Sequence, residues 1–282
     1  MTPPKRSRSA VTHRVLGSDP DLAYHLFVPE VRSPEPRLVV SIHGASRNVD
    51  VHAKLLSAYA EMYGASLLVP HFSATKYADF QRLGRVGRGR RADLALHRLV
   101  AEAALQIGAT TDRFYLFGFS GGAQFAHRYA MAYPRRVAYA VIANSGRYTL
   151  PDPEQTFPRG IRSTRKLPGL RFDLDAFLRI PMKVYVGKDI EAKTLPRRRR
   201  AKGDRDVPRA ERARRWVTAM EEACRSRHID SAITCEELPD RVRSFRSSVL
   251  RGGLAERAFQ AMFGSPLAER AEMPARETQS PA

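Results

Sequence analysis

The sequence predicts an α/β protein, in which helices cover both faces of a mostly parallel sheet. Short strand-like segments alternate along the chain with longer segments in which apolar residues recur at helical spacing. A Gly-x-Ser-x-Gly turn over residues 118–122 joins one such strand to the following helix. The chain has 282 residues, and α/β sheets of this size commonly fold around one core, so one domain is expected.

The first half of the chain predicts an opening hairpin, two further strands and two helices. The hairpin is expected over residues 12–16 and 23–28, and the strands over residues 38–42 and 66–70. Apolar spacing predicts helices over residues 50–63 and 92–107, and Gly108 is expected to end the second.

The second half predicts strands over residues 114–119, 137–143, 182–186 and 233–238. Helices are expected over residues 122–133, 209–226 and 253–263, with Pro134 ending the first. A Pro-rich, lid-like excursion spans residues 147–170. Its side chains either line an acyl pocket or pack a long surface loop; they are Tyr148, Pro151, Pro153, Phe157 and Pro158. We expect a domain over residues 12–264, between a basic disordered tail (1–11) and a polar disordered tail (265–282).

Composition favours a cytoplasmic protein. Hydrophobic residues make up 43% of the chain, yet no apolar run approaches the roughly 18 to 20 residues of a membrane span, and no apolar stretch near the start has the form of a signal peptide. The two cysteines, Cys224 and Cys235, are too few for a disulfide framework and lack metal-site spacing. We expect no membrane contact and no metal site.

The net charge of +19 favours binding to a polyanionic partner, including nucleic acid. Much of the excess lies in two arginine-rich stretches, residues 82–91 and 197–205. A solvated charge run explains such stretches more often than a binding site does, and the sequence contains no zinc-finger spacing, RNA-recognition motif or helix-turn-helix signature.

The turn over residues 118–122 carries the strongest chemical signal. A nucleophile on a sharp strand-to-helix turn needs small residues two positions before and after it, and Gly118 and Gly122 meet that demand. The helix that follows directs its N-terminal amides and dipole toward the turn, where they favour developing negative charge. Ser120 is therefore the candidate nucleophile.

A second motif, His43-Gly44-Ala45-Ser46, follows the predicted strand over residues 38–42. A loop in this place donates one backbone N–H to the oxyanion of an acyl-transfer reaction, and the residue after the nucleophile donates another. We assign these donors to Ala45 and Gly121, with Ser46 as the alternative to Ala45. His43 is expected to brace the loop rather than transfer protons.

These motifs resemble the bacterial α/β hydrolases related to poly(3-hydroxyalkanoate) depolymerases and dienelactone-hydrolase-like esterases. The resemblance spans about residues 12–264 and includes Val184-Tyr185-Val186-Gly187-Lys188-Asp189 and the closing helix from Leu254. It implies the α/β-hydrolase fold with an eight-stranded mostly parallel sheet, hydrolysis of carboxylic esters through an acyl-enzyme, no cofactor, and a triad in the order Ser, acid, His.

The resemblance implies that the acid follows the strand over residues 182–186. Asp189 is the first choice and Glu191 the alternative. Relatives commonly place the acid three residues after the glycine, where this chain has Ile190, and a one-residue deletion would leave Asp189 in the role. Related hydrolases often read Leu-Pro-Gly-x-Gly-His-Ser-Phe after the last strand, and in residues 238–245 of this chain the histidine position is Arg243. Arginine stays protonated and cannot act as a general base. The one histidine after the acid, His228, is expected at the opposite edge of the sheet.

Three functional hypotheses follow. The first is a serine esterase acting through Ser120, with His228 or another histidine as the base. The second is a degenerate hydrolase in which Arg243 and Asp189 pair inside the old pocket and an acidic ligand is bound without turnover. The third is a basic interaction protein that holds nucleic acid or another polyanion through its arginine-rich stretches. Fold alone cannot choose among them.

Overall fold

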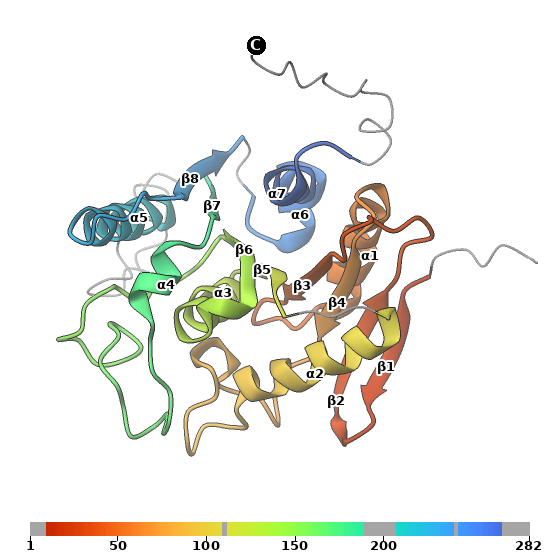
Figure 1. The fold of residues 1–282 in the computed structure, drawn as a ribbon, viewed down its shortest axis with the longest axis horizontal. Coiled ribbons are helices and arrows are strands. Elements are labelled where there is room, and N and C mark those ends of the chain that lie inside the picture. The colour runs from red at the N-terminus through yellow and green to blue at the C-terminus, as the bar shows by residue number, and fades with distance from the viewer. Residues whose placement is uncertain (1–9, 109–111, 189–206, 240–241, 267–282) are drawn as a thin grey trace, which may run out of the picture.

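The computed structural model describes residues 10–108, 112–188, 207–239 and 242–266. Its eight strands form one sheet in the order β1-β2-β4-β3-β5-β6-β7-β8 (Figure 1). The strands are β1 (Thr12–Leu16), β2 (Asp19–Phe27), β3 (Leu38–Ile42), β4 (Ser66–Pro70), β5 (Phe114–Phe119), β6 (Val137–Ala143), β7 (Met182–Gly187) and β8 (Ile233–Leu238).

The strand directions confirm the mostly parallel sheet that the sequence predicts. β2 pairs antiparallel with β1 and β4, and all other neighbouring pairs are parallel. The carboxyl ends of β3, β5, β6, β7 and β8 therefore lie at one edge of the sheet, where open α/β sheets bind their ligands. The Ser120 turn, the loop after β3 and the loop after β8 all belong to this edge.

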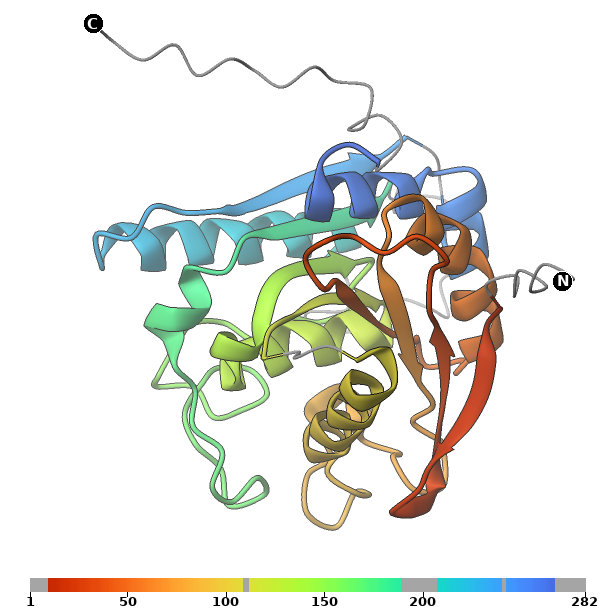
Figure 2. The ribbon, with the colours of Figure 1, turned by 45° about the vertical axis from the view of Figure 1, so that its right-hand side comes forward.

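Helices cover both faces of the sheet, as predicted (Figure 2). Alternate strand residues supply the two cores, so Val40 faces one layer and Val39 the other. One layer holds α2 (Ala92–Ile107), α3 (Gly121–Ala132), α4 (Leu174–Leu178) and α5 (Arg209–Arg225). The other holds α1 (Val49–Met62), α6 (Phe245–Leu250) and α7 (Leu254–Phe263). Two 3₁₀ turns, η1 (Phe80–Arg82) and η2 (Pro134–Arg136), complete the described elements.

Three elements differ from the sequence prediction. β2 begins at Asp19 rather than at residue 23, with a register shift between Val15 and Leu16 of its partner strand. The short helices α4 and α6 were not predicted, because five or six residues are too few to show a helical period. Local hydrogen bonds begin them instead: Asp173 caps α4, and Ser244 and Ser247 form a capping box at α6.

The excursion over residues 147–170 packs its named aromatic side chains into the protein. Phe157 is buried and stacks on Phe172, while Tyr148 stacks on Trp216 of α5 at a centroid distance of 4.9 Å. Of the two interpretations left open by the sequence, these contacts favour loop packing for both side chains.

The two predicted tails fall almost wholly outside the described residues. None of the helices in the described part of the chain combines the length and apolar character that crossing a membrane requires.

Asn144 connects three elements at the carboxyl edge of the sheet. It follows β6, has a left-handed backbone (φ 51°) and is 2% exposed. Its side-chain oxygen accepts a hydrogen bond from the Gly187 amide (2.7 Å), and its side-chain nitrogen donates to Ser248 Oγ (3.3 Å). The ends of β6 and β7 are thereby tied to α6.

We expect Asn144→Ala to lower the free energy of unfolding by about 1–3 kcal/mol, because the buried Gly187 amide loses its acceptor. Urea denaturation measures the change. The matched control is Asn48→Ala, at an exposed residue whose side chain caps nothing, which should change stability by under about 0.5 kcal/mol. Equal effects of the two substitutions would contradict the assignment of Asn144 as a tie.

Candidate functional site

Ser120 occupies a strained turn between β5 and α3. Its backbone angles are φ 52° and ψ −106°, a region that residues other than glycine rarely adopt. The Ser120 amide donates to the carbonyl oxygen of Ala143 at 2.8 Å, and its own carbonyl accepts from the Gln124 amide at 3.2 Å. These bonds hold the turn in place, with the half-buried serine at the N-terminus of α3.

The glycines on either side of Ser120 are required by close backbone contacts. A Cβ atom on Gly122 would overlap the carbonyl oxygen of Ile42 and lie 2.7 Å from that of His43. A Cβ atom on Gly118 would overlap the carbonyl oxygen of Gly122. The sequence argument for small residues at these two positions thus has a direct physical counterpart.

The loop after β3 lies against the serine turn. A Cβ atom on Gly44 would be 3.6 Å from the Ser120 Cβ, and one on Gly121 would be 3.0 Å from the Ala45 nitrogen. The Ala45 amide makes no hydrogen bond to another described residue, and the Gly121 amide lies in the first turn of α3, where amides lack intrahelical partners. This contact brings the Ala45 and Gly121 amides together, and no corresponding contact is seen for Ser46.

His43 is buried behind this loop and held by two hydrogen bonds. Its Nδ1 donates to the carbonyl oxygen of Gly44 (2.8 Å), and its Nε2 accepts from the Phe72 amide (3.0 Å). Burial lowers the pKa of His43 to about 4, so the ring is neutral near pH 7. These contacts agree with the bracing role expected from the sequence.

All eight histidines of the chain lie within the described residues, and the Ser120 side chain hydrogen-bonds none of them. His127, on α3, donates to the Ala123 carbonyl and accepts from the Thr149 amide. His228 is exposed after α5 and precedes β8, at the opposite edge of the sheet from Ser120, as predicted. The hypothesis that His228 serves as the base is therefore wrong for this structure. The remaining histidines are His13, His25, His43, His52, His71 and His97.

The loop after β8 reaches the serine turn through its neighbours. Phe245 packs against Phe119, which directly precedes Ser120, with ring centroids 5.4 Å apart. Val242 is buried against Gly187. Arg243, which lies between Val242 and Phe245 in the chain, is exposed and forms no ion pair with another described residue. The candidate acids Asp189 and Glu191, and with them the pairing of Asp189 with Arg243, lie outside the described residues.

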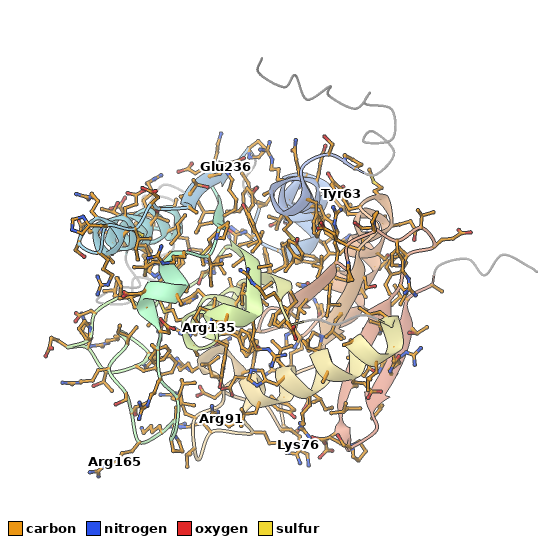
Figure 3. All side chains as sticks on the ribbon, in the orientation of Figure 1. Tyr63, Lys76, Arg91, Arg135, Arg165 and Glu236 are labelled. Carbon is orange, nitrogen blue, oxygen red and sulfur yellow. The ribbon has the colours of Figure 1, made fainter. Side chains whose placement is uncertain are left out.

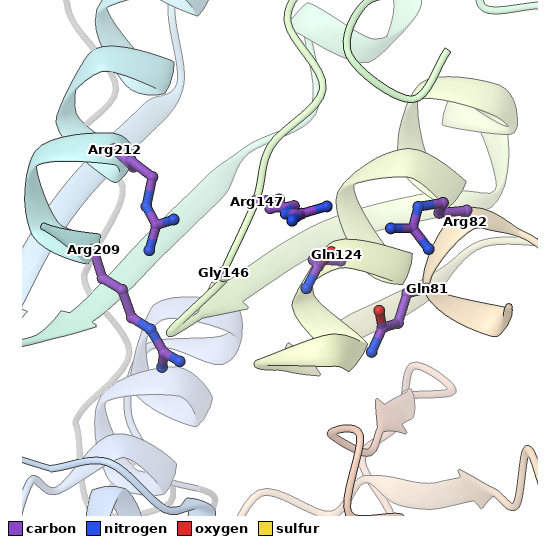
Figure 4. A pocket seen from close by; sticks show the side chains of 7 residues that line it. All are labelled: Gln81, Arg82, Gln124, Gly146, Arg147, Arg209 and Arg212. Carbon is purple, nitrogen blue, oxygen red and sulfur yellow. The ribbon is translucent and has the colours of Figure 1, made fainter. Parts of the chain in front are cut away.

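A cavity of about 410 Å³ lies beside the first turn of α3 (Figure 4). Its lining contains four guanidinium groups and two carboxamides, with no carboxylate and no aliphatic or aromatic side chain among the described residues. The carboxamide nitrogen of Gln81 approaches Gly121, to within 2.8 Å of where a Cβ atom would stand. The cavity and the serine turn are therefore adjacent. The lining residues are Gln81, Arg82, Gln124, Gly146, Arg147, Arg209 and Arg212.

A fully buried arginine, Arg128, lies on α3 one turn beyond Gln124. It donates to Thr149 Oγ1 (2.9 Å) and to the carbonyl oxygen of Gln81 (2.6 Å), and it forms no ion pair with a described residue. Burial lowers its pKa to about 9, and the positive charges of Arg82 and Arg147 act in the same direction. A further positive charge thus lies next to Gln81, one of the residues that line the cavity.

Most arginines of the stretch over residues 82–91 form ion pairs within the chain. Arg82 and Arg85 share Asp79, Arg90 pairs with Asp19, and Arg91 pairs with Asp93. Figure 3 labels Arg91 and also Lys76, which pairs with Asp21 at 2.9 Å. The second stretch, residues 197–205, lies outside the described residues.

The sequence reasoning missed most of the cavity lining. Gln124 was detectable, because it stands one helical turn after Ser120. Arg82 appeared only as a member of a charge run and Arg147 only as the start of an excursion, since nothing local indicates that they face one cavity. No group of three His, Cys, Asp or Glu side chains that could hold a metal ion occurs in the described part of the chain.

Comparison with known proteins identifies the fold. No protein-family model matches the chain, and no curated protein matches its sequence. Among solved structures, poly(aspartic acid) hydrolase-1 from Sphingomonas sp. KT-1 superposes with a TM-score of 0.72 at 20% identity, covering 90% of this chain and 98% of that one. LpqC, a poly(3-hydroxybutyrate) depolymerase from Bordetella parapertussis, gives 0.70 at 21% identity, covering 95% and 93%.

An S-formylglutathione hydrolase from Agrobacterium tumefaciens has the same architecture at lower similarity, with a TM-score of 0.55 and 15% identity over 89% of this chain and 94% of that one. These proteins are α/β-hydrolase-fold serine hydrolases. The chain therefore has the α/β-hydrolase fold, as its sequence motifs predict.

We expect Gly122→Ala to lower the free energy of unfolding by about 3 kcal/mol or to prevent folding, because the new methyl group overlaps backbone that cannot move independently. The matched control is Gly17→Ala, where an added Cβ meets nothing within 4 Å and no loss is expected. Urea denaturation of both variants checks the difference. A Gly122→Ala protein as stable as the control would show that the turn is not close-packed.

Lowering the pH should destabilise the folded protein through protonation of the buried His43. Its pKa is about 4 in the folded protein and near 6.5 in the unfolded chain, so its contribution is complete above pH 6.5 and is lost as pH falls toward 4. From pH 7 to pH 5 this histidine alone accounts for a loss of about 2 kcal/mol. Denaturation at both pH values should show that His43→Asn reduces the loss by about this amount. His228→Asn, at an exposed position, should not.

Proposed function

We propose that this chain binds a carboxylic ester at the Ser120 turn and hydrolyses it through an acyl-enzyme, at a rate far below that of a hydrolase with a complete triad. The observation that carries the proposal is the combination at one turn: Ser120 beside the amides of Ala45 and Gly121, with none of the eight histidines bonded to it.

In this mechanism the Ser120 Oγ attacks the carbonyl carbon, and the amides of Ala45 and Gly121 hold the negative charge that forms on the carbonyl oxygen. Collapse expels the alcohol, which takes up a proton, and a water molecule then hydrolyses the acyl-enzyme. Asp189, or Glu191 in its place, is the proposed acid. In a complete triad a histidine accepts the serine proton. Here that proton must pass to water or to the leaving alcohol, which is slow.

The expected loss is large. Removing the base from a triad costs on the order of a million-fold in turnover, while roughly a thousand-fold over water remains from the oxyanion donors and substrate binding. The proposed residual turnover still passes through the acyl-enzyme, so even at a low rate it should depend on Ser120.

The second candidate is a degenerate hydrolase that binds an acidic ligand without turnover. The arginine-lined cavity beside Ser120 favours it, and one of the similar structures is a hydrolase of poly(aspartic acid), a polyanion. Holding nucleic acid remains the third hypothesis, but the ion pairs of residues 82–91 leave less free charge for phosphate contacts than the sequence alone indicates. Salt-sensitive binding to DNA or RNA would support it.

A double-mutant cycle on turnover of a short-chain nitrophenyl ester tests the first proposal. We expect Arg243→His to raise kcat/KM at least about tenfold, because it returns a proton acceptor to the edge that carries Ser120. Ser120→Ala should lower the wild-type rate at least about tenfold, because no acyl-enzyme can then form, and it should abolish the gain in the Arg243→His background.

Arg246→His is the matched control, since Arg246 is also exposed and lies three residues further on. It should leave turnover unchanged. A wild-type rate that Ser120→Ala leaves unchanged would show that no acyl-enzyme forms at Ser120 and would contradict the proposal. Complete inactivity of wild type and Arg243→His would favour the second candidate.

A further inference from the structure

The cavity beside Ser120 has the wrong chemistry for a hydrophobic acyl chain. Ligand pockets are usually lined mainly by apolar side chains with a few polar groups. Among the described residues this lining has four arginines and two glutamines and no apolar side chain. A volume of about 410 Å³ is sufficient for a small organic ligand.

The charges of Arg82 and Arg147 are not fully balanced by carboxylates of the described residues. Arg82 bonds to Asp79 at 2.9 Å, but the same carboxylate also holds Arg85 at 2.7 Å. Arg147 is exposed and pairs with no carboxylate among the described residues. Beneath them the buried Arg128 bonds only to neutral oxygens. A bound anion would reduce the mutual repulsion of these groups.

The segment that carries Arg147 is held before any ligand arrives. The Ser145 hydroxyl donates to the Arg147 carbonyl oxygen at 2.8 Å. Two residues further on, Thr149 accepts at its carbonyl from Trp216 Nε1 (2.7 Å), which ties the segment to α5 and its Arg212, one turn earlier. Preorganised donors lower the entropic cost of binding.

The cavity also lies next to the serine turn. Gln124 follows Ser120 by one turn of α3, and the Gln81 carboxamide nitrogen lies 2.8 Å from where a Cβ atom on Gly121 would stand. A ligand with its carbonyl at the Ala45 and Gly121 amides would therefore extend its next few atoms toward the arginines. Guanidinium groups recognise carboxylates with paired hydrogen bonds.

We propose that the cavity holds a negatively charged carboxylate of the ligand, so that the preferred ligands are esters or acids carrying at least two carboxyl groups. The reactive carbonyl lies at Ser120 and a second, ionised carboxylate lies among Arg82, Arg147 and the arginines of α5. This inference rests on the proposed use of the Ser120 turn for acyl ligands, and its first test involves no turnover.

The first test is calorimetric titration of the full-length protein with citrate at low salt. Citrate should bind, its affinity should fall as salt rises, and the neutral triester triacetin should not bind. Arg147→Gln and Arg82→Gln should each weaken citrate binding at least about tenfold. The matched control is Arg88→Gln, which removes one charge from an exposed residue outside the cavity and should change the affinity less than about twofold.

Equal losses in Arg88→Gln and Arg147→Gln would show a diffuse field effect and would overturn the proposal, as would the absence of citrate binding. Tighter binding of inorganic phosphate than of citrate would overturn the assignment to carboxylates. Circular dichroism of the variants verifies folding, and because Arg82 and Arg147 lie on different segments, loss of one variant still leaves the other as a test.

The second test measures turnover in the Arg243→His background. Hydrolysis of 4-nitrophenyl hydrogen glutarate should exceed that of neutral 4-nitrophenyl butyrate at least about tenfold in kcat/KM, and Arg147→Gln should reduce that preference to about unity. Citrate binding without any ester turnover would sink the proposed function and leave this inference standing. Turnover of the neutral ester with no preference for the charged one would support the proposed function and overturn this inference.

Discussion

The backbone of the turn between β5 and α3 lies so close to the end of β3 that no side chain fits between them. Gly122 meets the carbonyl oxygen of Ile42 at this contact, and Gly118 meets Gly122. The strained conformation of Ser120 is the geometric consequence, because a strand can enter a helix over so few residues only through unusual dihedral angles. The same contact brings the Ala45 amide to Gly121, so the serine and both donors depend on one packing constraint.

Strand polarity and one buried asparagine assemble the rest of the edge. The parallel strands end on the same side, and Asn144 joins the end of β7 to α6. Val242 and Phe245 anchor the intervening loop, while Arg243 between them is exposed. An exposed position can change its side chain with little effect on stability. The fold therefore preserves the serine turn and its amides whether residue 243 is a proton acceptor or a permanent cation.

Sequence periodicity could predict the eight strands and the longer helices because each of those elements buries a regular set of apolar residues. The serine turn was predictable because its glycines and its position between strand and helix are local. The cavity was not: Gln81, Arg147 and Arg209 come from three separate segments that only the tertiary fold brings together. Short helices such as α6 also escape a periodicity argument, since local capping bonds rather than amphipathic spacing determine where they begin.

The arginines that contribute to the net charge of +19 have two different roles in this structure. At η1 and the start of α2, arginines form ion pairs with the buried carboxylates of Asp19, Asp79 and Asp93 and hold the loops there. Arg82 belongs to both groups, because it shares Asp79 with Arg85 and also lines the cavity. Around the cavity the described residues supply no carboxylate to the lining. Arg243, at the position where the resemblance implies a histidine, adds a further fixed positive charge at the carboxyl edge of the sheet. An arginine cannot accept the Ser120 proton, so in the proposed function the low turnover and the preference for an anionic ligand both follow from the arginines placed at this edge.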